Sequence, residues 1–410
     1  MASAIKFLHA ADLHLDQPVT GLAEIPAHLK ETLANAPYRA AERLFDVAIS
    51  ERVDFVLLAG DVVDLDQGGP RAAAFLLGQF ERLADKGIEI YWCGGSVDQP
   101  DRWPNAIQLP DNVVIFPSSM VEQAAHTREG LTIATICGAG AENRKRNPSD
   151  FRCVDDAPFP IALLHGDIDT TTLAAQNIRY WALGGHHKRK VIDKTSSVAV
   201  YPGTTQSRNP QEPGGHGCTL VHVDTAGKIR LQEMELDSVR WSLQRVTVAE
   251  NAKLDDLKTS LADRCSKLRS EYSDQLVLAK WRISTTGDFN PQLRSAEWHK
   301  ELVNWLRNEY GQSSNSLWTV AMKIDPPQQL PADWYEEETI LGDYLRSVGR
   351  FQGDASMGLS LMDYMPDNHT EDEFLTDLAR ISAEARQTVL QQAAVVGVEY
   401  LAQHDDSLDA

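Results

Sequence analysis

The sequence predicts an α/β protein in which a β-sheet is sandwiched by helices. In the first half of the chain, short β-rich apolar runs alternate with segments whose apolar residues recur at helical spacing. One of these runs, Asp54–Leu58 (DFVLL), is almost wholly apolar, which is typical of a strand buried on both faces. The composition, with 42% hydrophobic and 24% charged residues, is that of a globular protein, and 410 residues are enough for two to four domains.

The first elements follow one another in a regular order. Ile5–Leu8 is predicted to be a strand, and Tyr38–Arg52 has the spacing of an amphipathic helix. After the strand Asp54–Leu58, Arg71–Lys86 is predicted to be a second helix, which Gly87 ends. Further strands are predicted at Ile88–Trp92, Val113–Phe116, Leu131–Ile136, Ile161–Leu164, Val198–Tyr201 and Thr219–Val223.

The pattern changes after about Asp237. Three strands and two helices then predict a small α+β domain of roughly 90 residues. The strands are Trp241–Val248, Leu276–Ser284 and Ser316–Ile324, and the helices are Leu254–Tyr272 and Trp298–Tyr310. Pro326, Pro327 and Pro331 indicate a linker. We therefore expect three domains, at residues 1–237, 238–328 and 329–410.

The negative charge of the chain is concentrated in its helical, acidic C-terminal segment. Residues 331–410 hold 17 Asp and Glu against 4 Arg, whereas the whole chain holds 59 acidic and 39 basic residues. The rest of the chain is close to balanced, and its tight basic clusters, residues 144–146 and 188–190, form solvated loops or contact phosphate. In the acidic segment, Glu371–Gln392 carries the apolar stripe of a helix that packs on its own domain or docks on a basic partner.

The cysteines and the apolar runs indicate an intracellular protein. The five cysteines are far apart and form no CxxC pair, so we expect buried thiols, and neither a zinc site nor a disulfide framework. No apolar run approaches the roughly 18 residues that a membrane-spanning helix needs. The N-terminus has no secretory pattern, because His9 and Asp12 interrupt its apolar stretch. We expect a cytoplasmic location and no membrane partner.

Acidic and imidazole side chains follow the ends of several predicted strands. Asp12 and His14 come after the first strand, Asp61 after the second, His165 after Ile161–Leu164, and His187 after a strand-like run and two glycines. In open α/β sheets, the carboxyl ends of the strands are where sites are built. Mixed Asp and His ligands suit Mn²⁺, Fe²⁺ or Zn²⁺, and an Asp shared between two such ions is a usual way to hold a phosphate for hydrolysis.

The order of these motifs resembles that of the calcineurin-like metallophosphoesterases. Within that family the chain is similar to the SbcD-like DNA-repair exonucleases, most closely to the YhaO-like branch. The matching segments are Leu8–Asp16 (LHAADLHLD), Gly60–Asp64 (GDVVD), Leu164–Gly166 (LHG), Tyr180–Gly184 (YWALG), Tyr201–Thr204 (YPGT) and Glu212–Cys218 (EPGGHGC). The resemblance covers about residues 5–225 and fades beyond them.

The resemblance implies a fold, a metal site and partners. The fold is a calcineurin-like β-sandwich flanked by helices, with a DNA-facing α+β capping domain and a helical C-terminal segment. Asp12, His14, Asp61 and His187 match one metal site, with Asp61 shared, and His165 matches part of a second. Mn²⁺ is the expected metal, with Fe²⁺ or Zn²⁺ as alternatives. DNA is the expected substrate, and the expected partners are an SMC-like coiled-coil ATPase and a second copy of the chain.

The sequence departs from the family pattern at three positions. Ser96 replaces an Asn that ligates the second metal, Val97 replaces the His that protonates the leaving group, and Gly185 replaces a second-metal His. Losing the acid alone costs roughly 10²–10⁴ in rate. We therefore leave the catalytic residues unassigned. As replacements we consider His186, which would have to swing inward, and a group from elsewhere, namely His126, His216 or Asp98.

Three functions remain open at this stage. The first is a metal-dependent phosphodiesterase, a DNA-repair exonuclease or a less active relative of one, that acts on DNA ends. The second is a catalytically inactive subunit that scaffolds DNA or an SMC-like ATPase. The third is an enzyme acting on a small phosphoester, because a fold does not fix its substrate.

Overall fold

Two six-stranded sheets dominate the N-terminal unit of this protein. The structure is a computed structural model that describes residues 4–99, 103, 107–141, 146–153, 156–193, 196–249, 252–286, 296–313, 316–325, 330–354, 357, 359 and 382–405. These residues form two compact units, each discontinuous in sequence. The first contains residues 1–242, 271–278 and 312–318, and the second contains the rest. The predicted boundaries at residues 237 and 328 remain predictions.

The first sheet carries four parallel strands in its centre and at one edge. Its order is β12-β11-β1-β2-β3-β4; β1 to β4 run parallel, and β11 pairs antiparallel with both β1 and β12. The strands are β1 (Ile5–Ala10), β2 (Phe55–Ala59), β3 (Glu89–Cys93), β4 (Val113–Phe116), β11 (Gly217–Val223) and β12 (Ile229–Glu235). The parallel strands end at a common edge, so the loops after β1 and β2 lie next to each other.

The second sheet repeats this arrangement. Its order is β5-β6-β7-β8-β10-β9, and β6, β7, β8 and β10 run parallel. The strands are β5 (Glu122–Arg128), β6 (Leu131–Ala139), β7 (Pro160–His165), β8 (Tyr180–Gly184), β9 (Lys190–Asp193) and β10 (Val198–Tyr201). His165 is therefore the last residue of β7, and His187 follows β8, its parallel neighbour.

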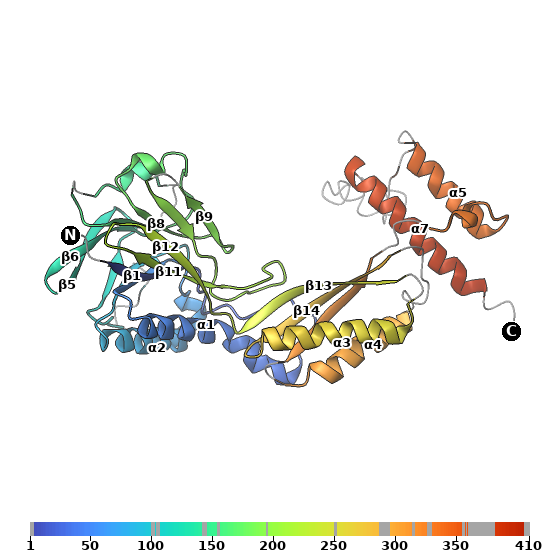
Figure 1. Ribbon diagram of the computed structural model, residues 1–410, viewed down its shortest axis with the longest axis horizontal. Coiled ribbons are helices and arrows are strands. Elements are labelled where there is room, and N and C mark those ends of the chain that lie inside the picture. Colours follow the sequence, from blue (N-terminus) through green and yellow to red (C-terminus); the bar gives the residue numbers. More distant parts are fainter. Residues whose placement is uncertain are drawn as a thin grey trace. The chain divides into compact units, whose positions relative to one another are not determined.

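The two sheets pack face to face over an apolar core. Phe7 and Phe55 of the first sheet stack with ring centroids 4.9 Å apart, and Tyr180 of the second sheet meets Phe7 edge-on at 5.2 Å. The outer face of the first sheet is covered by α1 (Lys30–Ser50) and α2 (Leu65–Ala84) (Figure 1). The predicted α/β class and calcineurin-like β-sandwich are confirmed. In the part of the chain that the structure describes, these two helices lie on the first sheet.

The second unit contains most of a three-stranded sheet and two helices. The sheet order is β13-β14-β15. The elements are β13 (Val239–Ala249), α3 (Leu254–Glu271), β14 (Leu276–Thr286), α4 (Ala296–Tyr310) and β15 (Leu317–Ile324) (Figure 1). Arg264 of α3 donates to Gln244 of β13 at 2.6 Å, and Arg307 of α4 donates to the Thr319 carbonyl of β15 at 2.9 Å. Both helices therefore contact the sheet.

The C-terminal helices α5 (Ile340–Gly353) and α7 (Ala383–Asp405) pack on each other. The hydroxyl of Tyr344 in α5 donates to the Ala393 carbonyl of α7 at 2.6 Å, and Leu390 is buried in their shared core. Only the last part of the predicted helix Glu371–Gln392 lies within the described residues. Arg144, Lys145, Pro326 and Pro327 lie outside them. In its described part, the helix packs within its own unit. No described helix is long and apolar enough to cross a membrane.

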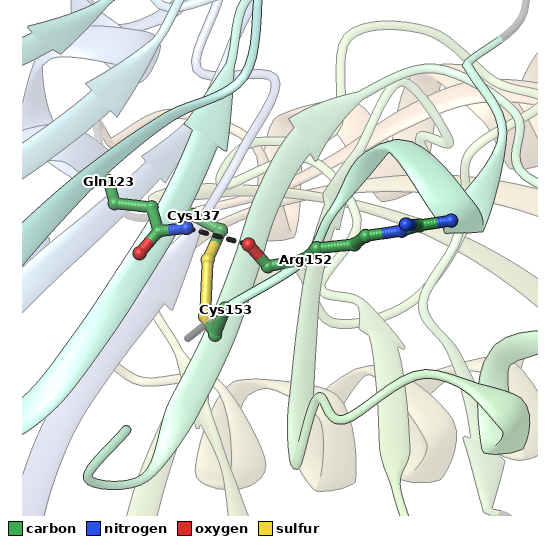
Figure 2. The surroundings of a disulfide bond; sticks show 4 residues. All are labelled: Gln123, Cys137, Arg152 and Cys153. Carbon is green, nitrogen blue, oxygen red and sulfur yellow. Dashed lines mark hydrogen bonds between the residues drawn. A yellow bond between two sulfur atoms is a disulfide. The ribbon is translucent and has the colours of Figure 1, made fainter. Parts of the chain in front are cut away.

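The prediction that all five cysteines are thiols is wrong for two of them. Cys137 of β6 and Cys153 form a disulfide, with their Cα atoms 6.6 Å apart (Figure 2). Beside it, Gln123 donates to the Arg152 carbonyl at 2.6 Å, which fixes the returning chain against β5. Folding of this segment back onto the sheet brings together cysteines that show no paired spacing in the sequence. The other three, Cys93, Cys218 and Cys265, are free and buried.

Candidate metal centre

The carboxyl ends of β1, β2, β7 and β8, with the loops that follow them, meet at one edge of the sandwich. They bring together all five residues that the sequence singles out as metal ligands. Asp12, His14 and His187 form one group, and Asp12, Asp61 and His165 form a second. Within each group the potential ligand atoms lie within 4.8 Å of one another. Asp12 belongs to both groups in this geometry, whereas the family resemblance gives Asp61 the shared role. The assignment of each residue to a particular ion therefore remains a proposal.

The backbone is bent sharply to aim these side chains. Asp12, His14 and Asp61 have φ angles of 53°, 44° and 51°, in the left-handed region that favours glycine. Main-chain hydrogen bonds from Asp12 N to the Gly60 carbonyl (2.9 Å) and from His14 N to the Asp61 carbonyl (3.0 Å) lock the two loops together. Each such non-glycine residue costs roughly 1–3 kcal/mol, and conformations of this kind cluster at functional sites.

His165 is oriented by the strand next to it. Its Nδ1 lies 2.9 Å from the Ala59 carbonyl, which accepts the Nδ1 proton. This leaves Nε2 facing the Asp61 carboxylate, 3.4 Å from Oδ2. A backbone carbonyl that fixes one ring nitrogen so that the other faces the site is a recurrent support for metal-binding histidines. Burial lowers the pKa of His165, but without a bound cation the Asp61 carboxylate outweighs burial and raises it to about 9.

The loop after β3 holds the Asp61 carboxylate. Oδ1 accepts hydrogen bonds from the backbone of Ser96 (2.6 Å) and of Val97 (3.1 Å), and the Ser96 hydroxyl lies 2.9 Å from both oxygens. Although burial raises the pKa of Asp61, hydrogen bonding and positive charge from His165 bring it well below its ordinary value. Ser96, which replaces an expected metal ligand, and Val97, which replaces the expected acid, therefore act here as hydrogen-bond donors to a candidate ligand.

Asp98 supports this loop from behind. Its carboxylate accepts hydrogen bonds from the backbone of Asp61 (2.9 Å), Val62 (3.0 Å) and Gly95 (2.6 Å) and from the Trp92 indole (3.0 Å). The sequence offered Asp98 as a replacement acid or ligand. The structure instead uses both oxygens to position the Asp61 loop.

Gly185 meets Asp12 through its backbone. Its N–H lies 2.9 Å from Oδ2 and 3.2 Å from Oδ1 of Asp12. The φ angle of Gly185 is 93°, and a Cβ added there would lie 3.2 Å from His165 Nε2. The residue that replaces an expected histidine thus contributes a backbone donor.

Arg208, which no sequence pattern singled out, reaches the candidate metal centre from the loop after β10. One guanidinium nitrogen lies 2.7 Å from Nδ1 of His187, and another donates to Gln17 at 2.6 Å. Glu212 completes the cluster, with Oε1 3.2 Å from His187 Nδ1 and 3.5 Å from Arg208. The position of Arg208 between the quoted YPGT and EPGG segments is the signal that would have drawn attention to it.

The donor set fits a divalent cation. His14 is buried, its two ring nitrogens have no hydrogen-bond partner among the described residues, and its Nε2 lies 4.0 Å from oxygens of Asp12 and of Asp61. Burial, together with the Arg208 guanidinium, lowers the pKa of His14 to about 4, so the ring is neutral with a free lone pair. Burial raises the pKa of Asp12 to about 6. A buried, unpaired imidazole beside two carboxylates is costly unless a cation is held there.

The three other histidines considered as replacements have partners elsewhere. His186 lies 2.6 Å from Asp167 and packs on the Tyr201 ring, and His126 lies 2.8 Å from Glu89. His216 lies 2.8 Å from the Thr204 hydroxyl. In the described residues none of the three belongs to either ligand group. A cavity of about 500 Å³ opens beside His187, and its lining includes Arg189, Glu212 and His216.

Comparisons with known proteins agree with this geometry. The family model for the calcineurin-like phosphoesterases matches residues 5–193. The "uncharacterized metallophosphoesterase YhaO" of Bacillus subtilis is 33% identical over 331 residues, which cover 74% of this chain and 81% of that protein. The "DNA double-strand break repair protein Mre11" of Sulfurisphaera tokodaii is 24% identical over 295 residues, which cover 66% of this chain and 70% of that protein.

Among solved structures, a dimetal phosphatase from Danio rerio aligns with 54% of this chain and 93% of its own, with a TM-score of 0.34 and 10% identity. The assignment of this chain to a family rests on the family model and on the 33% identity to YhaO. The family implies hydrolase chemistry and divalent metal binding, and the chain holds candidate ligand groups where that chemistry needs them. The chain therefore belongs to the calcineurin-like metallophosphoesterases.

Proposed function

We propose that this protein binds a divalent cation, Mn²⁺ in the first instance, and acts as a slow phosphodiesterase on DNA ends. The proposal rests mainly on the surroundings of His14. His14 is buried, lacks a hydrogen-bond partner in the described part of the chain, and lies between the carboxylates of Asp12 and Asp61 and the ring of His187. These four side chains are the proposed ligands of the first cation, and His165 is the proposed ligand of a second.

The position of each group around the candidate metal centre suggests its role in hydrolysis. A bound cation would polarise a phosphoryl oxygen and lower the pKa of a bound water. Arg208 would bind a second phosphoryl oxygen, because its guanidinium lies beside the proposed ligand His187, 2.7 Å from Nδ1. Gly185 N–H and the Ser96 hydroxyl hold Asp12 and Asp61 in place during this step. His165, fixed by the Ala59 carbonyl, stands beside Asp61.

We expect the rate of hydrolysis to be low. Val97 stands where the family resemblance puts the histidine that protonates the leaving group, and its side chain carries no proton to give. The loss of a general acid costs roughly 10²–10⁴ in rate. The leaving oxygen would then take its proton from water.

DNA is the proposed substrate because of the motif resemblance and of the likeness to Mre11, whose name assigns it to double-strand break repair. The same resemblance suggests an SMC-like ATPase and a second copy of the chain as partners. A deletion of residues 371–410 tests the partner proposal by co-purification. Loss of the ATPase would support docking by this segment, and unchanged capture would contradict it.

A second function has its own support. To hold a second cation, Asp61 would have to bind both cations at once. Both of its oxygens, however, already accept hydrogen bonds from the loop that contains Ser96 and Val97. Such a centre would bind one cation and hold DNA or a partner without cutting. This protein would then be a scaffold subunit rather than a nuclease.

The deciding experiment measures Mn²⁺-dependent degradation of linear DNA. The natural chain is compared with Asp61→Ala and with Asp66→Ala, a matched change at an exposed carboxylate in α2. Activity that is lost only in Asp61→Ala supports the phosphodiesterase. If all three proteins are equally inert while the natural chain still binds Mn²⁺ and DNA, the scaffold function is favoured.

A further inference from the structure

A basic cavity lies at the opposite ends of the strands that carry the candidate metal centre. Its volume is about 440 Å³, which is within the range of small-molecule sites. Lys6 in β1 and Asp54 just before β2 line it, whereas Asp12 and Asp61 follow the other ends of the same two strands. At about 3.3 Å per residue, the two sites are roughly 20 Å apart along the strands.

Five cationic side chains and two carboxylates line this cavity. The cations come from four separate segments, and they are Lys6, Arg52, Arg128, Lys228 and Arg230. The carboxylates are those of Asp54 and Asp224. Since the chain as a whole has 59 acidic and 39 basic residues, this excess of positive charge runs against its composition. A local positive cavity on a negative protein concentrates small anions.

The two carboxylates are occupied within the protein. Asp54 accepts hydrogen bonds from the backbone of Lys6 at 2.8 Å and from the Arg128 guanidinium at 2.9 Å, so each of its oxygens is used. Asp224 caps the β11–β12 turn, where Oδ1 accepts from the backbone of Ala226 and of Lys228 at 2.9 Å each. Neither carboxylate pairs with Arg52, Lys228 or Arg230 in the described residues.

Three of the cations remain available for a ligand. The side chains of Arg52, Lys228 and Arg230 are exposed, and in the described residues none of them donates to a protein acceptor. Lys6 is already held by Glu51, through the carbonyl at 2.8 Å and the carboxylate at 3.2 Å. Guanidinium and ammonium groups that line one cavity from separate segments match the oxygens of a chain of phosphates.

The backbone at Arg52 adds a second observation. Arg52 follows α1 with a φ of 52°, and its N–H donates to the Ile49 carbonyl at 3.1 Å. This left-handed position after a helix is usually taken by glycine, because other residues are strained there. An arginine side chain therefore lines the cavity at a position where glycine would cause less backbone strain.

We propose that this cavity is a binding site for a small polyphosphate ligand, such as a free phosphate chain or a nucleoside triphosphate. The site is separate from the candidate metal centre and does not rest on the proposed function. Binding there is electrostatic, needs no divalent cation and weakens with salt.

The test is calorimetric titration of the full-length protein in EDTA, so that the metal centre does not contribute. The probes are sodium tripolyphosphate, ATP and a single-stranded DNA oligonucleotide. Equal affinity for the first two assigns the site to the phosphate chain, and tighter binding of ATP assigns it to a nucleotide. No saturable binding of either, or displacement of tripolyphosphate by the DNA at an equal concentration of phosphate, would overturn the proposal.

Two variants locate the binding. Lys228→Gln with Arg230→Gln should weaken tripolyphosphate at least about tenfold, because two charge-assisted contacts are lost. Arg39→Gln with Lys86→Gln is the matched control, since it removes one Arg and one Lys at exposed positions outside the cavity. Arg52→Gly should also weaken binding about tenfold while keeping or raising thermal stability, because glycine relieves the backbone. Unchanged affinity for tripolyphosphate in both cavity variants would contradict the proposal.

Discussion

The hydroxyl of Ser96 lies 2.9 Å from each carboxylate oxygen of Asp61. This contact joins a residue that departs from the family pattern to a residue that keeps it. The backbone N–H groups of Ser96 and Val97 add two further hydrogen bonds to the same carboxylate. The loop after β3 thus holds Asp61, although it lacks the side chains that the resemblance assigns to metal binding and proton transfer.

Restoring those side chains should raise activity. Ser96→Asn with Val97→His should increase Mn²⁺-dependent hydrolysis of linear DNA by about 10²-fold, because a general acid and a ligand return together. Ser96→Asn with Val97→Leu is the matched control, since it supplies the ligand without the acid. Adding Gly185→His should lower thermal stability, because φ there is 93° and the new Cβ would lie 3.2 Å from the His165 ring. No gain in a folded double variant that binds two Mn²⁺ per chain would refute this account.

Removing the support behind the loop should cost stability and metal affinity together. Asp98→Asn places an amide NH₂ where a carboxylate oxygen now accepts two hydrogen bonds, so buried donors are left unpaired. The expected loss of unfolding free energy is about 2–4 kcal/mol. Denaturant unfolding and Mn²⁺ titration measure the two effects, with the exposed Asp66→Asn as control. Equal Mn²⁺ affinity in Asp98→Asn and the natural chain would argue against a positioning role.

Arg208 should affect the cation and the substrate in opposite directions. Its guanidinium lies 2.7 Å from His187 Nδ1, so Arg208→Gln removes a positive charge that opposes a cation and should tighten Mn²⁺ binding. The same change should weaken DNA binding about tenfold, because a charge-assisted contact to phosphate is lost. Separate titrations of metal and DNA measure this split, and Arg82→Gln in α2 is the control. A change in the same direction for both ligands would contradict the proposed role.

The disulfide should be detectable by counting thiols. Under oxidising conditions the denatured, unreduced protein should react as three thiols, because Cys137 and Cys153 are linked. Reduction should lower stability by about 3 kcal/mol, since the closed loop is near 15 residues long. Cys137→Ser with Cys153→Ser should remove the dependence on reductant, whereas Cys265→Ser should keep it. Five reactive thiols in the natural chain would show that the bond does not form.

Much of this fold follows from local pattern. The apolar run Asp54–Leu58 and the helical spacing of Tyr38–Arg52 lead directly to β2 and α1, because burial and periodicity act over a few residues. The same holds for the α+β elements after residue 237. The sequence did not show that α1 and α2 share one sheet face, or how far the helix that starts near residue 383 extends.

The sequence by itself determined which side chains are the candidate cation ligands. Asp12, Asp61 and His165 are found near the ends of apolar strands, and parallel strands bring their ends to one edge whatever the details of packing. It also determined that Val97 carries no acid, since that is a matter of side-chain chemistry alone.

Tertiary structure decided the rest. The hydrogen bonds from the Asp61 and Val62 backbone to Asp98, the contact of Arg208 with His187, the Gly185 amide on Asp12 and the Cys137–Cys153 bond all join residues 16 or more positions apart in the chain. Such contacts depend on how loops of particular length return over the sheets, and no local periodicity encodes that. The chemical capacity of each side chain could be predicted from its residue type. Its contact partner was fixed only by the packing of the strands into two sheets.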